Sequence, residues 1–476
     1  MEQSRQDSQA GDRPLTAGGG ARMNVTETLA EWLCAQRWES VPEMARRKAV
    51  DVVFDSVGAM IACSQLPEVA SMVKLLQRMG GKAECTMVGY EGLTSVVNAA
   101  MANGGMAHGD EADPVHLRSV GGHVAAGPVP TALTMGQWLG TGGREVLRAV
   151  ALGYEMGGRL MTIFYRERDY GARRFYPTAV VGTISSAVTA GVLLGLNREQ
   201  MQVAMCLAAY QAAGPDNMTK DPGHMGKTFQ VGAANRNGVT AALLAHGGCH
   251  APLDILDGSH SLFDAYLDAP DAGGEMLKGL GEYYSITDVM HKRYPVGSPN
   301  QAYLQGLFGL IRKHALQPRD IAEIEVQIPS RGLKRIPATR HASISALSVC
   351  AIAAAQLKLD FYQLHDPAGA TDKAARDMQQ RVKFVGREDW TGMEAGRHAF
   401  VTIKTHNGEV LTADVRYEPM TRAELDLKFD ALVLPRFGKE KCARVAKMLK
   451  GLEAAKSVKP LMAELAGISS SRTGKV

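Results

Sequence analysis

The segment AHGDEADPVHLRSVGGH, residues 107–123, concentrates side chains that can move protons. Its seventeen positions hold three acids, three histidines and one arginine. An imidazole with an ordinary pKa of about 6.5 can take and give a proton near neutral pH, so His116 and His123 are the natural proton carriers. Glu111 or Asp113 is expected to orient one of them or to act as a base. We interpret the segment as an active-site loop.

Two other interpretations of this loop stay open, a solvated connection between helices and a metal site. Ligands are available in His108, Asp110, His116 and His123, but their spacing matches no common zinc or iron template. No GxxxxGK[ST] pattern occurs, and no GxGxxG follows an apolar strand and opens a helix, which disfavours ATP and nicotinamide. The sequence therefore predicts neither a metal nor an organic cofactor.

Length, charge and cysteine usage narrow the class of protein. The 476 residues suffice for two or more domains, and 53 basic against 49 acidic residues give a net charge of +4, which does not favour a nucleic-acid partner. Seven cysteines without a CxxC indicate buried thiols in a reducing compartment. We find no signal peptide and no uncharged apolar window of eighteen residues. A cytoplasmic protein without a membrane partner is expected.

The elements that must position the loop are helices in the first half of the chain. Residues 1–23 are polar and Gly-rich and are predicted to be a disordered tail. Apolar residues recur at helical spacing in three stretches, residues 41–64, 143–163 and 177–196. The third is apolar on nearly all faces, as in a helix packed on several sides. Asn197, with Gln200 three positions later, predicts the start of another helix.

The pattern changes after about residue 280. IAEIEVQI, residues 321–328, alternates as a half-buried strand does, and Asn407-Gly408 predicts a hairpin. Helical stretches lie around 299–316 and 344–357, so we predict a smaller α+β domain over 280–415. Thr421 and Glu424 have the spacing of a capping box, after which helices resume. The predicted architecture is mainly α, a large helical domain built from 24–279 and 416–476 with the α+β domain inserted as a lid.

Eight sequence blocks run from about residue 25 to the last helices: NGGMAHGDEADPVH, GHVAAGPVPTAL, LRAVALGYEMGGRL, RRFYPTAVVGT, KTFQVGAANRNGV, DILDG, KRYPVGSP and MTRAELDLKF. In this order they resemble the MmgE/PrpD family, which includes 2-methylcitrate dehydratase, cis-aconitate decarboxylase and iminodisuccinate epimerase. The resemblance implies a helical domain with a smaller α+β lid and a homodimer. It also implies chemistry beside a carboxylate, in which a proton moves to or from carbon without an obligatory organic cofactor.

The resemblance implies site residues in the loop. Glu111 and Asp113 match acidic positions of the family, although Pro114 replaces the second member of its usual Asp pair. His123 matches the histidine that begins a His-Pro-Gly, which Val124 breaks.

Further site residues are implied outside the loop. Lys227 matches the lysine of a Lys-Arg-Leu-His block, in which Gln230 replaces the histidine, and Lys292 matches the lysine of a Lys-Pro-Tyr-Pro block. Tyr176 stands where the best-known members carry histidine. At two positions where decarboxylases have histidine and tyrosine, this chain has Gly297 and Ala346, which argues against decarboxylation in particular.

These residue types suggest roles. Lys227, Lys292 and Arg118 are candidates for holding substrate carboxylates, the arginine in bidentate fashion. Tyr176 can donate a proton to a departing hydroxyl, and His224 is a candidate for a substrate contact specific to this branch of the family, with an ordinary loop histidine as the alternative.

The leading hypothesis is a cofactor-independent lyase of the dehydratase or hydratase type, acting on a small carboxylate or hydroxy-polycarboxylate. One alternative is an isomerase or epimerase with the same carbon-acid chemistry. Another is a family member without catalysis. Convergence of Glu111, Asp113, His123, Lys227 and Lys292 at the junction of the two domains would favour the enzyme hypotheses.

Overall fold

The computed structural model describes residues 24–119, 121–166, 174–217, 221, 226–333, 341–366, 372–391 and 397–467. The predicted disordered tail and the candidate His224 lie outside these residues. The protein is mainly α, as predicted. The first half comprises the helices α1 (Val25–Ala35), α2 (Glu43–Cys63), α3 (Pro67–Met79), α4 (Val96–Ala107), α5 (Pro128–Leu139), α6 (Gly143–Arg166), α7 (Pro177–Leu194), α8 (Arg198–Gln211), α9 (Gly226–His246) and α10 (Leu262–Leu267).

Local signals set several of these helix ends. The side chain of Asn24 accepts a hydrogen bond from the backbone of α1 and caps it. The predicted capping box of α8 is confirmed, because Asn197 and Gln200 each bond the backbone of the other.

Helix α7 lies at the centre of the helical body and is buried along almost its whole length. A side chain on Gly238 of α9 would come within 2.5 Å of the Thr183 carbonyl of α7, so glycine allows the two backbones to approach closely. Contrary to the expectation from sequence, α7 is an uncharged segment of eighteen residues that is long and apolar enough to cross a membrane. The pair α2–α3, bent by 86°, is also long and apolar enough if it is taken as one span. Inside the protein 89% of α7 is buried, as in a core helix.

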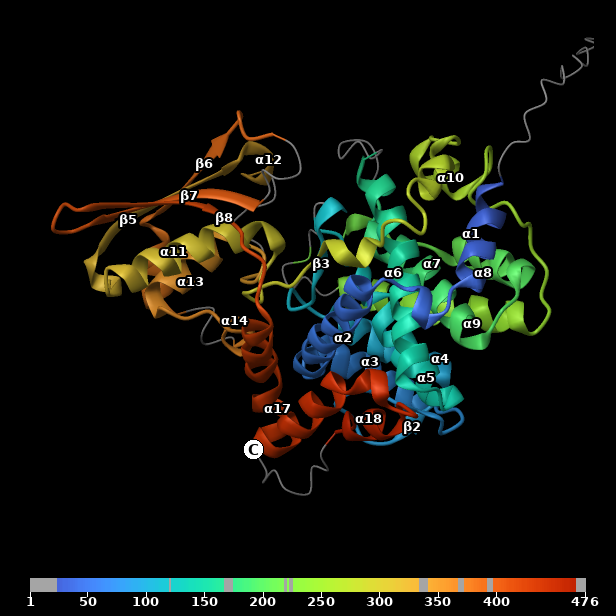
Figure 1. Cartoon of the computed structure of the whole chain (residues 1–476). Coiled ribbons are helices and arrows are strands. Elements are labelled where there is room, and N and C mark those ends of the chain that lie inside the picture. The colour runs from blue at the N-terminus through green and yellow to red at the C-terminus, as the bar shows by residue number, and fades with distance from the viewer. Residues whose placement is uncertain are drawn as a thin grey trace, which may run out of the picture.

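A four-stranded sheet occupies the other side of the molecule (Figure 1). The strands β5 (Ile321–Pro329), β6 (Val382–Arg387), β7 (His398–Thr405) and β8 (Val410–Arg416) are ordered β6-β5-β7-β8. The hairpin predicted at Asn407-Gly408 joins β7 to β8, with Gly408 at φ 91. The parallel strand β6 was not predicted, because its short sequence, VKFVGR, shows no sustained apolar alternation. None of its side chains is fully buried.

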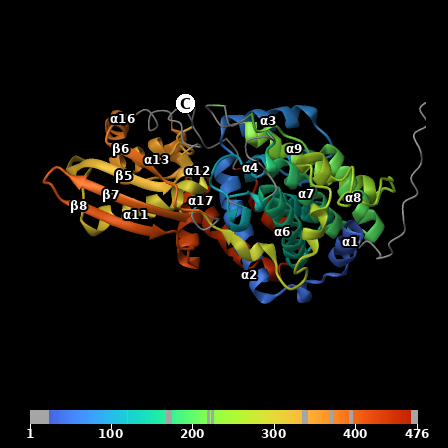
Figure 2. The same ribbon diagram turned by 90° about the horizontal axis from the view of Figure 1, so that it is seen from above.

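Helices connect and cover this sheet. They are α11 (Gln301–Lys313), α12 (Ser330–Leu333), α13 (Ala346–Gln356), α14 (Phe361–His365) and α16 (Lys373–Gln379). Apolar side chains of α11 and α13 pack with the sheet into a hydrophobic core separate from that of the helical body. Seen from two directions, the sheet with these helices lies beside the helical body (Figures 1 and 2). The predicted helices at 299–316 and 344–357 correspond to α11 and α13.

The C-terminal part of the chain packs against the helical body. Helix α17 (Arg422–Lys450) begins with the predicted Thr421–Glu424 capping box, is interrupted at Gly438 and is followed by α18 (Lys459–Glu464). Phe429 of α17 stacks on Phe54 of α2 with ring centroids 4.3 Å apart. Both ends of the chain therefore contribute to one core.

Close backbone contact at the start of α6 supports a stability prediction. A Cβ on Gly143 would lie 1.6 Å from the Leu452 carbonyl oxygen, so Gly143→Ala forces α6 away from the C-terminal segment. We expect the free energy of unfolding to fall by about 1–3 kcal/mol, as in other overpacked sites. Urea unfolding followed by circular dichroism measures this change. The control is Gly309→Ala in α11, where nothing lies within 4 Å and alanine favours the helix. Equal stability of both variants would contradict the prediction.

Candidate active site

The loop between α4 and α5 is folded inward. It begins at His108, the C-cap of α4, and its strand β3 (Val115–His116) pairs with β4 (Val289–Met290) from a distant part of the chain. The side chains of Asp110, Glu111 and Asp113 are buried. Buried carboxylates are stable only when positive or hydrogen-donating groups compensate them, so their partners define the site.

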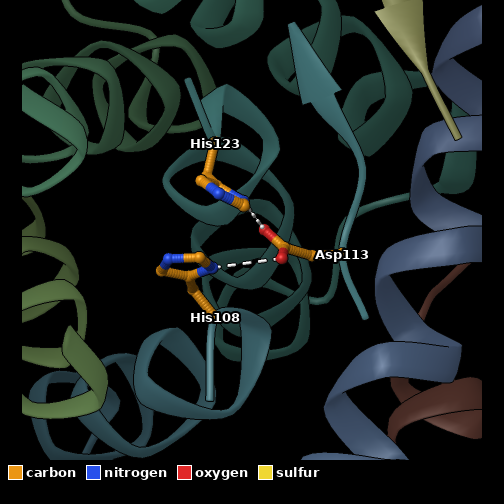
Figure 3. Close-up of side chains that lie close together, drawn as sticks. All are labelled: His108, Asp113 and His123. Atoms are coloured by element: carbon orange, nitrogen blue, oxygen red, sulfur yellow. Dashed lines mark hydrogen bonds and ion pairs between the residues drawn. The ribbon is translucent and has the colours of Figure 1, made fainter. Parts of the chain in front are cut away.

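Asp113 bridges two histidines with its two oxygens (Figure 3). His108 Nδ1 lies 3.1 Å from Asp113 Oδ1, and His123 Nδ1 lies 2.9 Å from Asp113 Oδ2. The two imidazole rings lie close together, with centroids 3.9 Å apart and planes tilted by 42°. Burial acts to raise the pKa of Asp113, but the two histidines outweigh it and hold that pKa well below the ordinary value. An ionised Asp113 therefore accepts an N–H from each ring.

The other ring nitrogen of His108 is hydrogen-bonded to Tyr176. The Tyr176 hydroxyl lies 2.6 Å from His108 Nε2. Burial lowers the pKa of His108 to about 4, against the opposing charge of Asp113, so the ring is neutral at pH 7. A neutral ring that donates Nδ1–H to Asp113 has its lone pair on Nε2, which we assign as the acceptor of the tyrosine O–H. Burial also raises the pKa of Tyr176 well above its usual value, so the phenol keeps its proton.

Glu111 joins two buried lysines. Its Oε1 lies 2.8 Å from Lys227 Nζ, and its Oε2 lies 2.7 Å from Lys292 Nζ. Lys227 stands in the first turn of α9, whereas Lys292 follows β4, so this carboxylate ties two remote segments to the loop. Burial would lower the pKa of Lys227, but the charges of Glu111 and Asp110 raise it above its ordinary value. Both lysines are therefore partners of the loop carboxylates and are not open to solvent.

The third carboxylate, Asp110, faces residues from the other side of the molecule. His365, the last residue of α14, places Nε2 2.8 Å from Asp110 Oδ2. The hydroxyl of Ser343, just before α13, donates to Asp110 Oδ1 at 3.0 Å, and Lys227 Nζ lies 3.2 Å from the same oxygen. His341 lies beside this group, with its ring 5.3 Å from that of His365.

A further buried ion pair lies behind Lys292. Asp55 of α2 contacts Lys428 of α17 at 2.5 Å and the Nδ1 of His291 at 2.7 Å. His291 directly precedes Lys292, and the Tyr417 hydroxyl donates to the His291 carbonyl oxygen at 2.6 Å. Lys428 of α17 and Tyr417, just before α17, thus help to fix the segment that carries Lys292.

The structure brings together six of the residues proposed from sequence. Hydrogen bonds and ion pairs connect them into one cluster through His108: Glu111, Asp113, His123, Tyr176, Lys227 and Lys292. These residues come from the loop between α4 and α5, the start of α7, the start of α9 and the segment after β4, which is the convergence expected of an enzyme site.

Two proposed residues lie in a neighbouring group around Asp288. Arg118 places Nε 2.6 Å from Asp288 Oδ2, stacks over Tyr283, and leaves 53% of its side chain exposed. His116 is buried with Nε2 3.9 Å from the same oxygen, and burial lowers its pKa to about 4. Neither contacts the Asp113 pair through a hydrogen bond among the described residues.

Sequence reasoning considered His108 and Asp110 only as metal ligands and did not find Ser343, His341 or His365. The four ligands considered for a loop metal do not surround one point, because Asp110 and His116 each lie in a different group from His108 and His123. The missed residues stand more than two hundred positions from the loop in segments without a motif, so no signal in the sequence identified them.

Comparison with known proteins adds a family assignment. The sequence model of the MmgE/PrpD N-terminal domain matches residues 27–275, and that of the MmgE/PrpD C-terminal domain matches residues 294–454. A cis-aconitate decarboxylase of Aspergillus terreus is 25% identical over 94% of this chain and 97% of its own length. The cis-aconitate decarboxylase of Homo sapiens is 29% identical over 40% of this chain and 39% of its own, and that of Mus musculus 32% identical over 46% and 44%.

Proposed function

The chain belongs to the MmgE/PrpD family, and from that premise we propose that it is a lyase that removes water from, or adds water to, a small hydroxycarboxylate without an organic cofactor. The observation that carries this proposal is the Asp113 carboxylate shared by His108 and His123, with Tyr176 on the outer nitrogen of His108. This arrangement prepares two proton carriers of different kind, an imidazole and a phenol.

His123 is the proposed base. Its Nδ1–H points to Asp113, which leaves the electron pair on Nε2, and 11% of the side chain is exposed, so a substrate can reach it. In dehydration, Nε2 takes the proton from the carbon next to a substrate carboxylate. The electron pair of that C–H bond forms the C=C bond as the C–O bond to the hydroxyl breaks.

Tyr176 is the proposed acid. It gives up its hydrogen bond to His108 Nε2 and transfers the O–H proton to the departing hydroxyl, which leaves as water. The proton that His123 took from carbon then returns the phenolate to the phenol. The high pKa that burial gives Tyr176 favours the protonated form before reaction. Hydration runs through the same steps in reverse.

Lys227 and Lys292 are proposed to hold substrate carboxylate oxygens in addition to Glu111. An ammonium has three N–H donors. Among the described residues, Lys227 directs two of them to Asp110 and Glu111, and Lys292 directs two to the side chain and backbone carbonyl of Glu111. Both ammonium groups are buried, so an anionic substrate would reach the third donor of each lysine only when the surrounding contacts open.

We further propose that the sheet β5–β8, with α11 and α13, acts as a lid over this cluster. Support comes from Ser343 and His365, which belong to segments beside this sheet and contact Asp110 of the loop. A relative movement of the two parts would open or close the site at these contacts.

The test of the lyase proposal is proton NMR in heavy water with a panel of di- and tricarboxylates and hydroxy acids. We expect the wild type to exchange a carbon-bound proton and to form or consume a vinyl signal. His123→Gln should lose both signals by at least about 100-fold, because it removes the base. Tyr176→Phe should retain exchange but lose water elimination by a similar factor.

Other results of this screen have defined meanings. Exchange and inversion without a vinyl signal would replace the lyase proposal with an isomerase. Equal activity of His123→Gln and the wild type would refute His123 as the base, and silence across the panel would refute the proposed substrate class.

Decarboxylation is a second candidate, since the Aspergillus terreus relative that matches nearly the whole chain is a cis-aconitate decarboxylase. The same NMR panel includes cis-aconitate. Formation of a decarboxylated product from it, lost in His123→Gln, would favour this candidate. Conversion of cis-aconitate to a hydrated product would favour the leading proposal.

A further inference from the structure

Asp110, His341 and His365 form a second cluster beside the proposed proton carriers. One carboxylate oxygen of Asp110 and one ring nitrogen from each histidine lie within 4.8 Å of one another. Asp110 Oδ2 is buried and accepts no hydrogen bond of ordinary geometry from the described residues, although His365 Nε2 approaches it to 2.8 Å. The partner of this oxygen is the His365 imidazole, and a metal ion would replace the proton between them.

The surrounding hydrogen bonds hold both rings beside Asp110 and turn one nitrogen of His365 toward it. His365 Nδ1 lies 2.7 Å from the carbonyl oxygen of Phe361, to which it donates, so Nε2 is the nitrogen turned toward Asp110. His341 Nδ1 lies 2.8 Å from the hydroxyl oxygen of Ser343 and 3.4 Å from the Ser343 backbone nitrogen, and the Ser343 hydroxyl donates to Asp110 Oδ1. His365 thus has the arrangement common in metal-binding histidines, which donate the other ring N–H to a carbonyl oxygen.

We propose that Asp110, His341 and His365 bind one divalent transition-metal ion, with zinc as the probe. Two imidazoles and one carboxylate are ligands that zinc prefers, and three protein ligands leave a fourth position open. Tetrahedral ligands about 2.0–2.1 Å from zinc lie roughly 3.3 Å apart, so the 2.8 Å contact needs to widen by about 0.5 Å.

Charge supports an ion at this position. Without it, the carboxylates of Asp110, Glu111 and Asp113 are balanced by Lys227, Lys292 and a protonated His365. A zinc ion replaces the His365 proton and raises the net charge of the cluster by one unit. An anionic substrate is then attracted to the open position.

The Asp113 pair is a poorer metal site, although its atoms satisfy the same distance condition. Both Asp113 oxygens already accept an imidazole N–H, and the outer nitrogen of His108 is occupied by Tyr176. Zinc there would have to break three hydrogen bonds. Asp110 Oδ2 and His365 Nε2 need to lose only their shared proton.

The experiment is isothermal titration of zinc into the full-length protein after treatment with a chelator. We expect one zinc per chain in the wild type and at least ten-fold weaker binding in His341→Gln, His365→Gln and Asp110→Asn. Substituting Co²⁺ provides a second readout, because a four-coordinate Co²⁺ site gives a visible absorption band that these variants should lose. Circular dichroism confirms that each variant is folded.

His123→Gln and His398→Gln, the latter in strand β7 beside Asp414, are the controls and should bind zinc like the wild type. Binding that is unchanged in all three ligand variants, or that is absent from the wild type, would overturn the site. Loss in His123→Gln with retention in His365→Gln would place the ion at Asp113 instead and would equally overturn it.

The role of the ion as a carboxylate anchor rests on the proposed function, but its binding does not. Zinc is titrated without substrate, so a failure of the metal site is seen there. A failure of the lyase proposal is seen in the NMR panel, run with and without zinc.

Discussion

Replacing Asp113 with asparagine should reduce turnover about 10³- to 10⁴-fold while leaving the fold intact. The carboxylate accepts an N–H from both His108 and His123, whereas an asparagine amide has one accepting oxygen and one donating NH₂ group. The imidazole that faces the NH₂ group must adopt the opposite tautomer. Either His123 then loses the electron pair on Nε2, or His108 can no longer accept from Tyr176. A wrong tautomer in a carboxylate–histidine pair costs a factor of this size in other enzymes.

The measurement is the initial rate of the reaction identified by NMR, compared between Asp113→Asn and the wild type across pH. The matched control is the surface change Asp414→Asn, beside His398, which should retain full activity. A loss below ten-fold in Asp113→Asn would show that the two imidazoles do not depend on this carboxylate.

Glu111→Gln should lower the free energy of unfolding by about 3–5 kcal/mol. Glu111 is the carboxylate within hydrogen-bond distance of Lys292, and it shares Lys227 with Asp110. Removing its charge leaves Lys292 buried without an equal partner, and breaking a buried ion pair on one side is strongly destabilising. The shift of the urea unfolding midpoint, followed by circular dichroism, measures the effect.

Two further variants isolate the charge effect. Glu323→Gln breaks an exposed pair with Lys404 and should cost about 0–1 kcal/mol. The double variant Glu111→Gln with Lys292→Met removes the uncompensated charge and should recover part of the lost stability. If the double variant is less stable than Glu111→Gln alone, the ion-pair explanation is wrong.

Much of the fold could be predicted from the sequence because its signals are local. Asn197 with Gln200 and Thr421 with Glu424 are capping boxes that need only three residues of context, and the structure has both. Asn407-Gly408 likewise determines its hairpin alone. The parallel pairing of β6 with β5 depends on contacts far apart in the chain, which local periodicity does not report.

The site divides in the same way. The loop was recognisable because acids and histidines cluster within it, and Lys227 and Lys292 were found through the resemblance to a family. His365 and His341 are single histidines without a motif, and only the folded chain places them at Asp110. Arg118 and His116 are close to the site in sequence, yet both side chains face Asp288. His116 lies in β3 and Arg118 in the turn after it.

The order in which the chain is synthesised bears on how this loop can fold. The three loop carboxylates precede Lys227 by more than one hundred residues, and Lys292, His365 and Lys428 emerge later still. Until those residues leave the ribosome, burial of the carboxylates has no compensating charge, so the loop stays hydrated. The helices around it can form early, but the reactive centre is completed only when α17 docks on α2. An unfinished chain therefore carries no premature activity.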